Sequence, residues 1–108
     1  MLKTPELRYV SYKGGRLAYR EAGEGPVLFF FHGMNGSSRS WLYIFEALSP
    51  SFRIVAWDAP SFGDSDTYGD RIEDYVQAAR ALLHAIEINE AIVIGHSMGG
   101  VIAARFAA

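Results

Sequence analysis

Three short apolar runs, each followed by turn-forming residues and then a helical pattern, constrain the fold of this chain most. The runs are Val27–Phe31, Phe52–Trp57 and Ala91–Ile94. Val27–Phe31 has no polar alternation, as expected for a strand that is covered on both faces. Ala91–Ile94 is likewise predicted to be a buried strand. Strands that alternate with helices indicate a mostly parallel sheet.

The helical segments have apolar residues at spacings of three and four. The first contains Trp41 to Leu48, with Ser37 or Ser38 as its N-cap, and the second covers Ile72–Ile86. A third helix begins at about Met98. A hairpin precedes them all, because Glu6–Tyr12 and Arg16–Ala22 flank the turn Lys13-Gly14-Gly15, whose glycines can take positive φ. The predicted class is α/β: a mostly parallel sheet with an N-terminal antiparallel hairpin and helices on both faces.

Composition limits the classes of function. The chain has 108 residues, 50% of them apolar, so it is one domain at most and can bury a core. A net charge of −2 gives no reason to expect nucleic acid or an anionic membrane as a partner. There is no cysteine, no signal-peptide core in MLKTPELRYV and no apolar run long enough to span a bilayer. We therefore expect a soluble, cytoplasmic chain.

The pentad Gly95-His96-Ser97-Met98-Gly99 lies between the last apolar run and a helix of small residues. A serine on such a strained strand-to-helix turn is exposed for nucleophilic attack, and the glycines make room for the turn. The free N–H groups of the following helix face the reaction. The alternative is that the glycines serve only tight helix–strand packing. The strand before and the helix after the pentad favour a nucleophile elbow.

Two further motifs precede the elbow. His32-Gly33 follows the Val27–Phe31 strand, where a backbone N–H can complete an oxyanion hole with the N–H of Met98. His32 itself is interpreted as a structural histidine that holds this loop. The Asp58–Asp66 segment is rich in carboxylates, which are expected to cap turns and to accept backbone hydrogen bonds. No spacing matches a metal site, so no metal is assigned.

The segments FFFHGMNGSSRSW, VAWDAPSFGDSD and VIGHSMGG, in this order, resemble the N-terminal half of the α/β-hydrolase fold superfamily. The resemblance implies that residues 1–108 are the N-terminal part of a single α/β-hydrolase domain that ends just after the elbow. It implies a serine hydrolase without a cofactor, acting on a small ester-like molecule (a carboxylic ester, thioester or lactone) or a related carbonyl substrate. Serine rather than aspartate in the elbow points away from the dehalogenase and epoxide-hydrolase branches. The implied roles are nucleophile for Ser97, oxyanion-hole N–H donors for Met34 and Met98, and support of the elbow and loop for His32, Gly33, Gly95, His96 and Gly99.

The sequence departs from the family pattern in two ways. Ser61 stands where members of the family usually carry glycine, so the loop backbone either differs or tolerates serine there. The family's catalytic acid and histidine follow the nucleophile, and neither is expected within this chain.

The histidines present are not expected to replace the missing one. His84 is predicted to be solvated, and the His96 side chain to leave the turn in another direction. The catalytic interpretation therefore requires a complementing C-terminal half. The alternative from another class is a non-catalytic fragment that folds with a partner or associates with itself through an exposed sheet edge.

Overall fold

The computed structural model describes residues 4–108 and places five strands in one sheet, in the spatial order β1-β2-β4-β3-β5. The N-terminal segment searched for a signal peptide begins with Met1–Lys3, which lie outside the described residues. The strands are β1 (Arg8–Tyr12), β2 (Gly15–Ala22), β3 (Val27–Phe31), β4 (Arg53–Trp57) and β5 (Ile92–Gly95). The helices are the 3-10 helix η1 (Ser38–Trp41), α1 (Leu42–Leu48), α2 (Ile72–Ala85) and α3 (Met98–Ala107).

The sheet combines a parallel core with an antiparallel hairpin, which confirms the predicted fold class. β3 pairs in parallel with β4 on one side and with β5 on the other. β1 and β2 form the hairpin, and β2 joins the core by antiparallel pairing with β4. The hairpin turn differs in one detail from the expectation: Lys13 and Gly14 take the positive φ angles, 46° and 78°, while Gly15 already belongs to β2.

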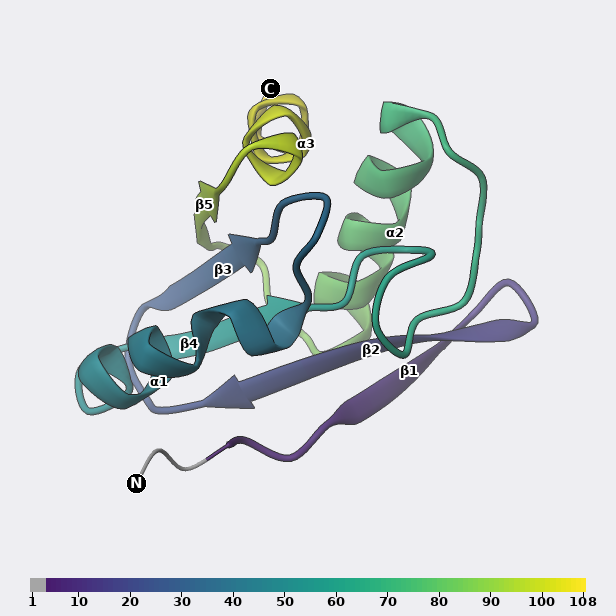
Figure 1. Ribbon diagram of the computed structural model, residues 1–108. Helices are drawn as coiled ribbons and strands as arrows, with labels where there is room; N and C mark the ends of the chain where they lie inside the picture. Colours follow the sequence, from purple (N-terminus) through teal and green to yellow (C-terminus); the bar gives the residue numbers. More distant parts are fainter. Residues whose placement is uncertain (1–3) are drawn as a thin grey trace.

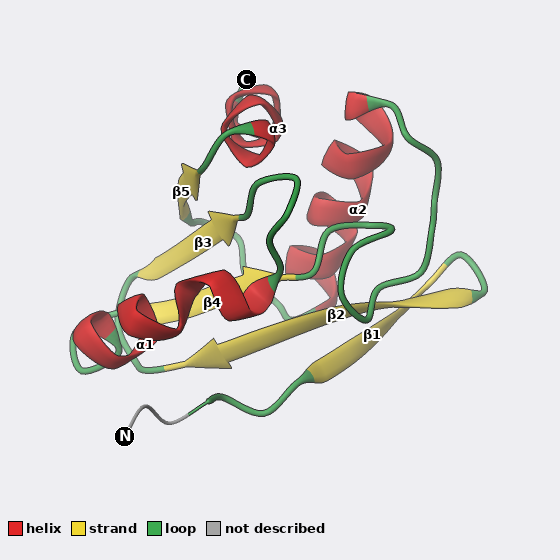
Figure 2. Ribbon diagram, in the orientation of Figure 1, coloured by secondary structure: helices red, strands yellow, loops and turns green. Residues whose placement is uncertain are grey.

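Helices cover both faces of the sheet, with η1 and α1 on one side and α2 and α3 on the other (Figures 1 and 2). Alternate residues of β3 explain how both layers are held, because successive side chains of a strand point to opposite faces. Leu28 and Phe30 pack in a cluster with Phe45 of α1, whereas Phe29 and Phe31 pack with the residues of α2 and α3. The strand is therefore covered on both faces, as its unbroken apolar run predicts.

β5 is less buried than its sequence predicts. It pairs only with β3 and lies at the end of the sheet, so one edge of its backbone has no neighbouring strand among residues 4–108. Ile92 is 58% exposed as a result, and Val93 and Ile94 are only partly buried. Position in the sheet, which apolar composition alone does not specify, accounts for this difference.

The helices start and end close to their predicted limits. Ser37 caps η1 by accepting a hydrogen bond from the Arg39 N–H at 3.1 Å, and α1 continues directly from η1.

Within residues 4–108, no helix is both long enough and apolar enough to cross a membrane.

Candidate active site

Ser97 lies in the turn between β5 and α3 with a backbone conformation that a residue with a side chain rarely adopts. Its φ is 56° and its ψ is −121°. The surrounding hydrogen bonds hold it there: the His96 N–H donates to the Phe31 carbonyl at 3.1 Å, and the Gly100 N–H donates to the Ser97 carbonyl at 2.9 Å. Strained residues of this kind persist only where neighbouring structure fixes them, and they cluster at functional sites.

The two glycines of the pentad allow the elbow to pack against backbone. A Cβ on Gly99 would overlap the carbonyl oxygens of Phe31 and His32, and a Cβ on Gly95 would overlap backbone atoms of Gly99 and Gly100. Any larger residue would therefore separate α3 from the end of β3. The predicted supporting role of Gly95 and Gly99 has this steric basis.

The loop after β3 folds into a tight turn beside the elbow. The Gly36 N–H donates to the Gly33 carbonyl at 3.0 Å and closes the turn. Gly33 is buried and close to the elbow, since an added Cβ would lie 3.0 Å from Nδ1 of His96 and 3.3 Å from the Ser97 Cβ. The peptide group that joins Gly33 to Met34 is thereby placed next to Ser97.

His32 is buried beneath this loop, and both of its ring nitrogens have partners. Nε2 accepts a hydrogen bond from the Ala59 N–H at 3.0 Å, and Nδ1 lies 2.7 Å from the Gly33 carbonyl oxygen. Burial lowers the imidazole pKa from its ordinary value of 6.5, and the Gly33 hydrogen bond and the Asp58 charge only partly oppose this effect. The neutral ring therefore joins two loops, which agrees with a structural role for His32.

Met34 and Met98 each follow a residue that lines the cavity, Gly33 and Ser97 respectively. Met98 is the first residue of α3, where N–H groups have no acceptor within the helix. Met34 follows Gly33 in the tight turn, and its side chain is 64% exposed at the mouth of the site. Neither N–H group has a hydrogen-bond acceptor among the described residues.

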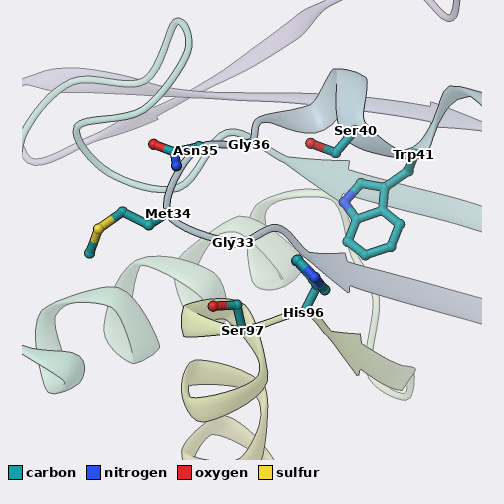
Figure 3. Close-up of a pocket in the computed structure, with 8 residues that line it drawn as sticks. All are labelled: Gly33, Met34, Asn35, Gly36, Ser40, Trp41, His96 and Ser97. Carbon is teal, nitrogen blue, oxygen red and sulfur yellow. The ribbon is translucent and has the colours of Figure 1, made fainter.

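A cavity of about 510 Å³ lies in front of Ser97 (Figure 3). None of its lining side chains is acidic or basic apart from the imidazole of His96. Four of the lining residues were not among the sequence-predicted site residues. The lining residues are Gly33, Met34, Asn35, Gly36, Ser40, Trp41, His96 and Ser97.

The four additional residues carried only weak sequence signals. Trp41 follows the helical apolar pattern, and its ring does pack on Phe30 at 4.8 Å between centroids. Asn35, Gly36 and Ser40 occur in a loop whose composition alone does not distinguish a site from a turn. A polar loop directly after His32-Gly33, and so beside the elbow, is the signal that could have identified them.

Neither of the other two histidines is hydrogen-bonded to the Ser97 hydroxyl. His84 is exposed on α2. The His96 ring lines the cavity beside Gly33, where an added Cβ would lie 3.0 Å from its Nδ1, whereas the Ser97 hydroxyl points away from this ring (Figure 3). These orientations agree with the expectation that the His96 side chain leaves the turn in another direction.

The carboxylates of the loop after β4 bind backbone N–H groups, as predicted. Asp58, which is 2% exposed, accepts from Ser38 at 2.6 Å and from Asp64 at 3.0 Å, and Asp66 accepts from Arg16 at 2.8 Å. In residues 4–108, no three His, Cys, Asp or Glu side chains are grouped so that they could hold a metal ion. Residues of this loop bind Ser38 and His32, which follow β3, but none of them lines the cavity.

Comparison with known proteins identifies a family that this chain matches. A family model described as the alpha/beta hydrolase fold matches residues 26–108. An uncharacterized protein of Mycobacterium tuberculosis is 32% identical over 105 residues, which are 95% of this chain and 31% of the relative. An epoxide hydrolase from an endophytic Streptomyces has a similar structure, with a TM-score of 0.87, 33% identity, and coverage of 94% of this chain and 32% of that chain.

A second structure comes from a protein with a different activity. The crystal structure of a membrane phospholipase A gives a TM-score of 0.89 at 29% identity, covering 94% of this chain and 34% of that chain. The chain thus spans about a third of the length of each of these three proteins.

Proposed function

The chain belongs to the alpha/beta-hydrolase fold family, and we propose that it forms the nucleophile-bearing part of a serine hydrolase. Ser97 is the nucleophile, and the substrate is a small ester-like molecule: a carboxylic ester, thioester or lactone. The backbone N–H groups of Met34 and Met98 bind the oxyanion. The observation that carries this proposal is the strained conformation of Ser97, φ 56° and ψ −121°, at the edge of a cavity.

The reaction begins when Ser97 Oγ forms a bond with the carbonyl carbon and the carbonyl electrons move to oxygen. The Oγ proton passes to a base, which later returns it to the leaving alcohol or thiol when the bond to that group breaks. Water then releases the acyl group. N–H donors that stabilise the oxyanion contribute about 100- to 1000-fold in rate each.

Serine at the elbow favours ester-like substrates over epoxides. The similar structures include an epoxide hydrolase and a phospholipase A, so the fold alone does not choose between these chemistries. The epoxide-hydrolase branch is expected to carry aspartate at the nucleophile position, whereas residue 97 is serine. A serine alkoxide attacks a carbonyl, and two N–H groups beside it suit a tetrahedral oxyanion.

We propose that the base comes from a residue other than the three histidines. Both nitrogens of His32 are engaged, His84 lies on the exposed side of α2, and His96 points away from the Ser97 hydroxyl. We propose that a complementing C-terminal half of the fold supplies the acid and the imidazole, with no cofactor or metal, and that the enzyme works in the cytoplasm.

The alternative is a non-catalytic chain whose β5 edge binds a partner or a second copy. The exposure of Ile92, and the edge of β5 that has no neighbouring strand within residues 4–108, favour it. The two proposals differ in what they require of Ser97, because only the hydrolase needs a reactive hydroxyl. A test of Ser97 reactivity therefore separates them.

The experiment treats the purified chain with a fluorophosphonate probe, which forms a covalent bond with activated serines, in buffer with increasing imidazole as an external base. The variants are Ser97→Ala and Ser40→Ala, the second of which removes another hydroxyl from the same cavity. We expect labelling at Ser97, mapped by mass spectrometry, with a rate that rises with imidazole concentration. Ser40→Ala should keep the labelling and Ser97→Ala should abolish it.

Two outcomes would contradict the serine-hydrolase proposal. One is equal labelling of the wild-type chain and Ser97→Ala, which would mean that the probe reacts elsewhere. The other is no labelling of the wild-type chain at any imidazole concentration, which would favour the non-catalytic alternative.

A further inference from the structure

We propose that Trp41 determines the substrate class: the side of its indole ring that faces the cavity stacks on a flat, uncharged ring attached to the substrate carbonyl. The substrate would then be an ester of an aromatic acid. The proposal rests on the proposed function for the reaction at Ser97, and it adds the chemical class of the acyl group.

The indole ring of Trp41 is fixed by packing on one side. Trp41 is the last residue of η1, and its ring centroid lies 4.8 Å from that of Phe30, with the two planes tilted by 45°. Phe30 itself belongs to the buried cluster that contains Leu28 and Phe45. The ring is only partly buried, and it lines the cavity together with Ser97 (Figure 3). One side of a rigid aromatic ring is therefore available to a ligand.

Packing alone does not account for a tryptophan at this position. Its Nε1 is buried, and it has no hydrogen-bond partner within residues 4–108. A buried N–H group without an acceptor lowers the stability of the folded chain. Phenylalanine would fill much of the same apolar site without that loss. Residues that lower stability without a structural gain are expected at functional sites, and the cavity supplies a function for this ring.

The rest of the cavity suits an uncharged ligand. Its volume is about 510 Å³, and none of its lining side chains carries a fixed charge. The polar side chains that Asn35 and Ser40 contribute are neutral. An ionised group on the substrate would lose its hydration here without gaining a partner of opposite charge. A flat aromatic group, in contrast, gains an offset or edge-to-face contact with the indole ring of Trp41.

The test measures binding and needs no reaction at Ser97. Benzamide and cyclohexanecarboxamide carry the same uncharged carbonyl group, on a flat and on a puckered six-membered ring respectively. Each is titrated into the purified, nitrogen-15-labelled chain. The dissociation constants are obtained by NMR from the backbone amide signals of the cavity residues Gly33, Gly36 and Ser97.

We expect benzamide to bind about 5- to 10-fold more tightly than cyclohexanecarboxamide, the effect of one aromatic contact. The indole N–H signal of Trp41 should shift with benzamide. The signal of Trp57 is the internal control, because this residue is fully buried and does not line the cavity. Its Nε1 is also without a partner, so the two indole groups differ in their access to the cavity.

Two substitutions separate binding from packing. Trp41→Leu keeps an apolar side chain but has no flat face, so the two dissociation constants should come within about 2-fold of each other. Trp41→Phe keeps a smaller flat face and should retain a reduced preference for benzamide. In urea unfolding followed by circular dichroism, Trp41→Phe should have a midpoint no lower than that of the wild-type chain. A purely structural role of Trp41 predicts instead that both variants lose stability and that neither changes the preference.

Several results would overturn the role of Trp41. They are equal binding of the two amides to the wild-type chain, no saturable binding of either amide, and an unchanged preference for benzamide in folded Trp41→Leu. If neither variant folds, the comparison of the two amides and of the two indole signals in the wild-type chain decides. A chain that prefers benzamide but is not labelled by the fluorophosphonate probe would support the role of Trp41 and contradict only the reaction proposed at Ser97.

Discussion

The backbone N–H of Ser38 donates to Oδ1 of Asp58 at 2.6 Å, and this bond joins the start of η1 to the loop that follows β4. Oδ2 of the same carboxylate accepts from the Asp64 N–H at 3.0 Å. One buried side chain therefore ties the start of η1 to the loop after β4. Charge-assisted bonds of this kind are stronger than neutral ones.

Asp58→Ala should destabilise the chain by about 2 to 4 kcal/mol, because the buried N–H of Ser38 and the partly buried N–H of Asp64 lose their acceptor. The free energy of unfolding can be measured by urea denaturation, followed by the fluorescence of Trp41 and Trp57. Asp64→Ala is the matched control, since it removes an exposed carboxylate from the same loop and should change stability by less than about 0.5 kcal/mol. Similar losses in the two variants would contradict the role of Asp58.

Gly99→Ala and Gly100→Ala should have opposite effects on the free energy of unfolding, although the two residues are neighbours in α3. A Cβ at Gly99 would overlap the Phe31 and His32 carbonyls, so we expect a loss of at least about 3 kcal/mol. A Cβ at Gly100 would have its nearest neighbour outside α3, the Gly95 carbonyl oxygen, at 3.7 Å, and alanine there should stabilise the helix by about 0.5 to 1 kcal/mol. Thermal unfolding by circular dichroism measures both, and a stable Gly99→Ala variant would contradict the packing described for the elbow.

Ser97→Gly should be more stable than Ser97→Ala by about 1 kcal/mol. Glycine adopts φ 56° with ψ −121° without the strain that a Cβ causes, and this gain exceeds its greater entropy in the unfolded chain. Both variants lack the hydroxyl, so their comparison isolates the backbone strain. Equal unfolding free energies in urea would show that the elbow stores no strain at Ser97.

Ser61→Gly should stabilise the chain by about 0.5 to 1 kcal/mol, because Ser61 has a φ of 75°. The backbone at this position has the positive φ that suits the glycine usual in the family. Serine is tolerated there, but it lowers the stability of the folded chain. Its hydroxyl bond to Thr67 is exposed and contributes little. As a control, Ser51→Gly is in an exposed turn without positive φ and should not stabilise; an equal gain there would exclude strain at Ser61 as the cause.

Stability should decrease as the pH falls below 6.5, in part because of His32. The folded-state pKa of this buried ring is lowered from 6.5, even though the nearby Asp58 charge and the Gly33 bond oppose the shift. Below 6.5 the unfolded chain therefore binds a proton that the folded chain does not, and the free energy of unfolding falls. Urea denaturation between pH 7.5 and 5.5 should show this dependence in the wild-type chain and a weaker one in His32→Asn. Identical slopes would contradict it.

Local sequence patterns predicted most of the fold. The apolar runs predicted the bounds of β3, β4 and β5 to within about one residue, and the helical spacing predicted those of α2 equally well. Both signals depend only on residues that are neighbours in the sequence. The exposure of Ile92 was not predictable in the same way. It depends on which strands pair with β5, and hydropathy does not encode a strand's position in the sheet.

The sequence by itself determined that a serine would stand between a strand and a helix, and that glycines would surround it, since the residues of the elbow are contiguous. Only the tertiary structure decided what lies opposite Ser97 and which backbone groups His32 binds. The bonds from Ala59 to His32 and from Ser38 to Asp58 join residues 27 and 20 positions apart. Such contacts form only when β3 and β4 pair side by side and bring their following loops together at one edge of the sheet.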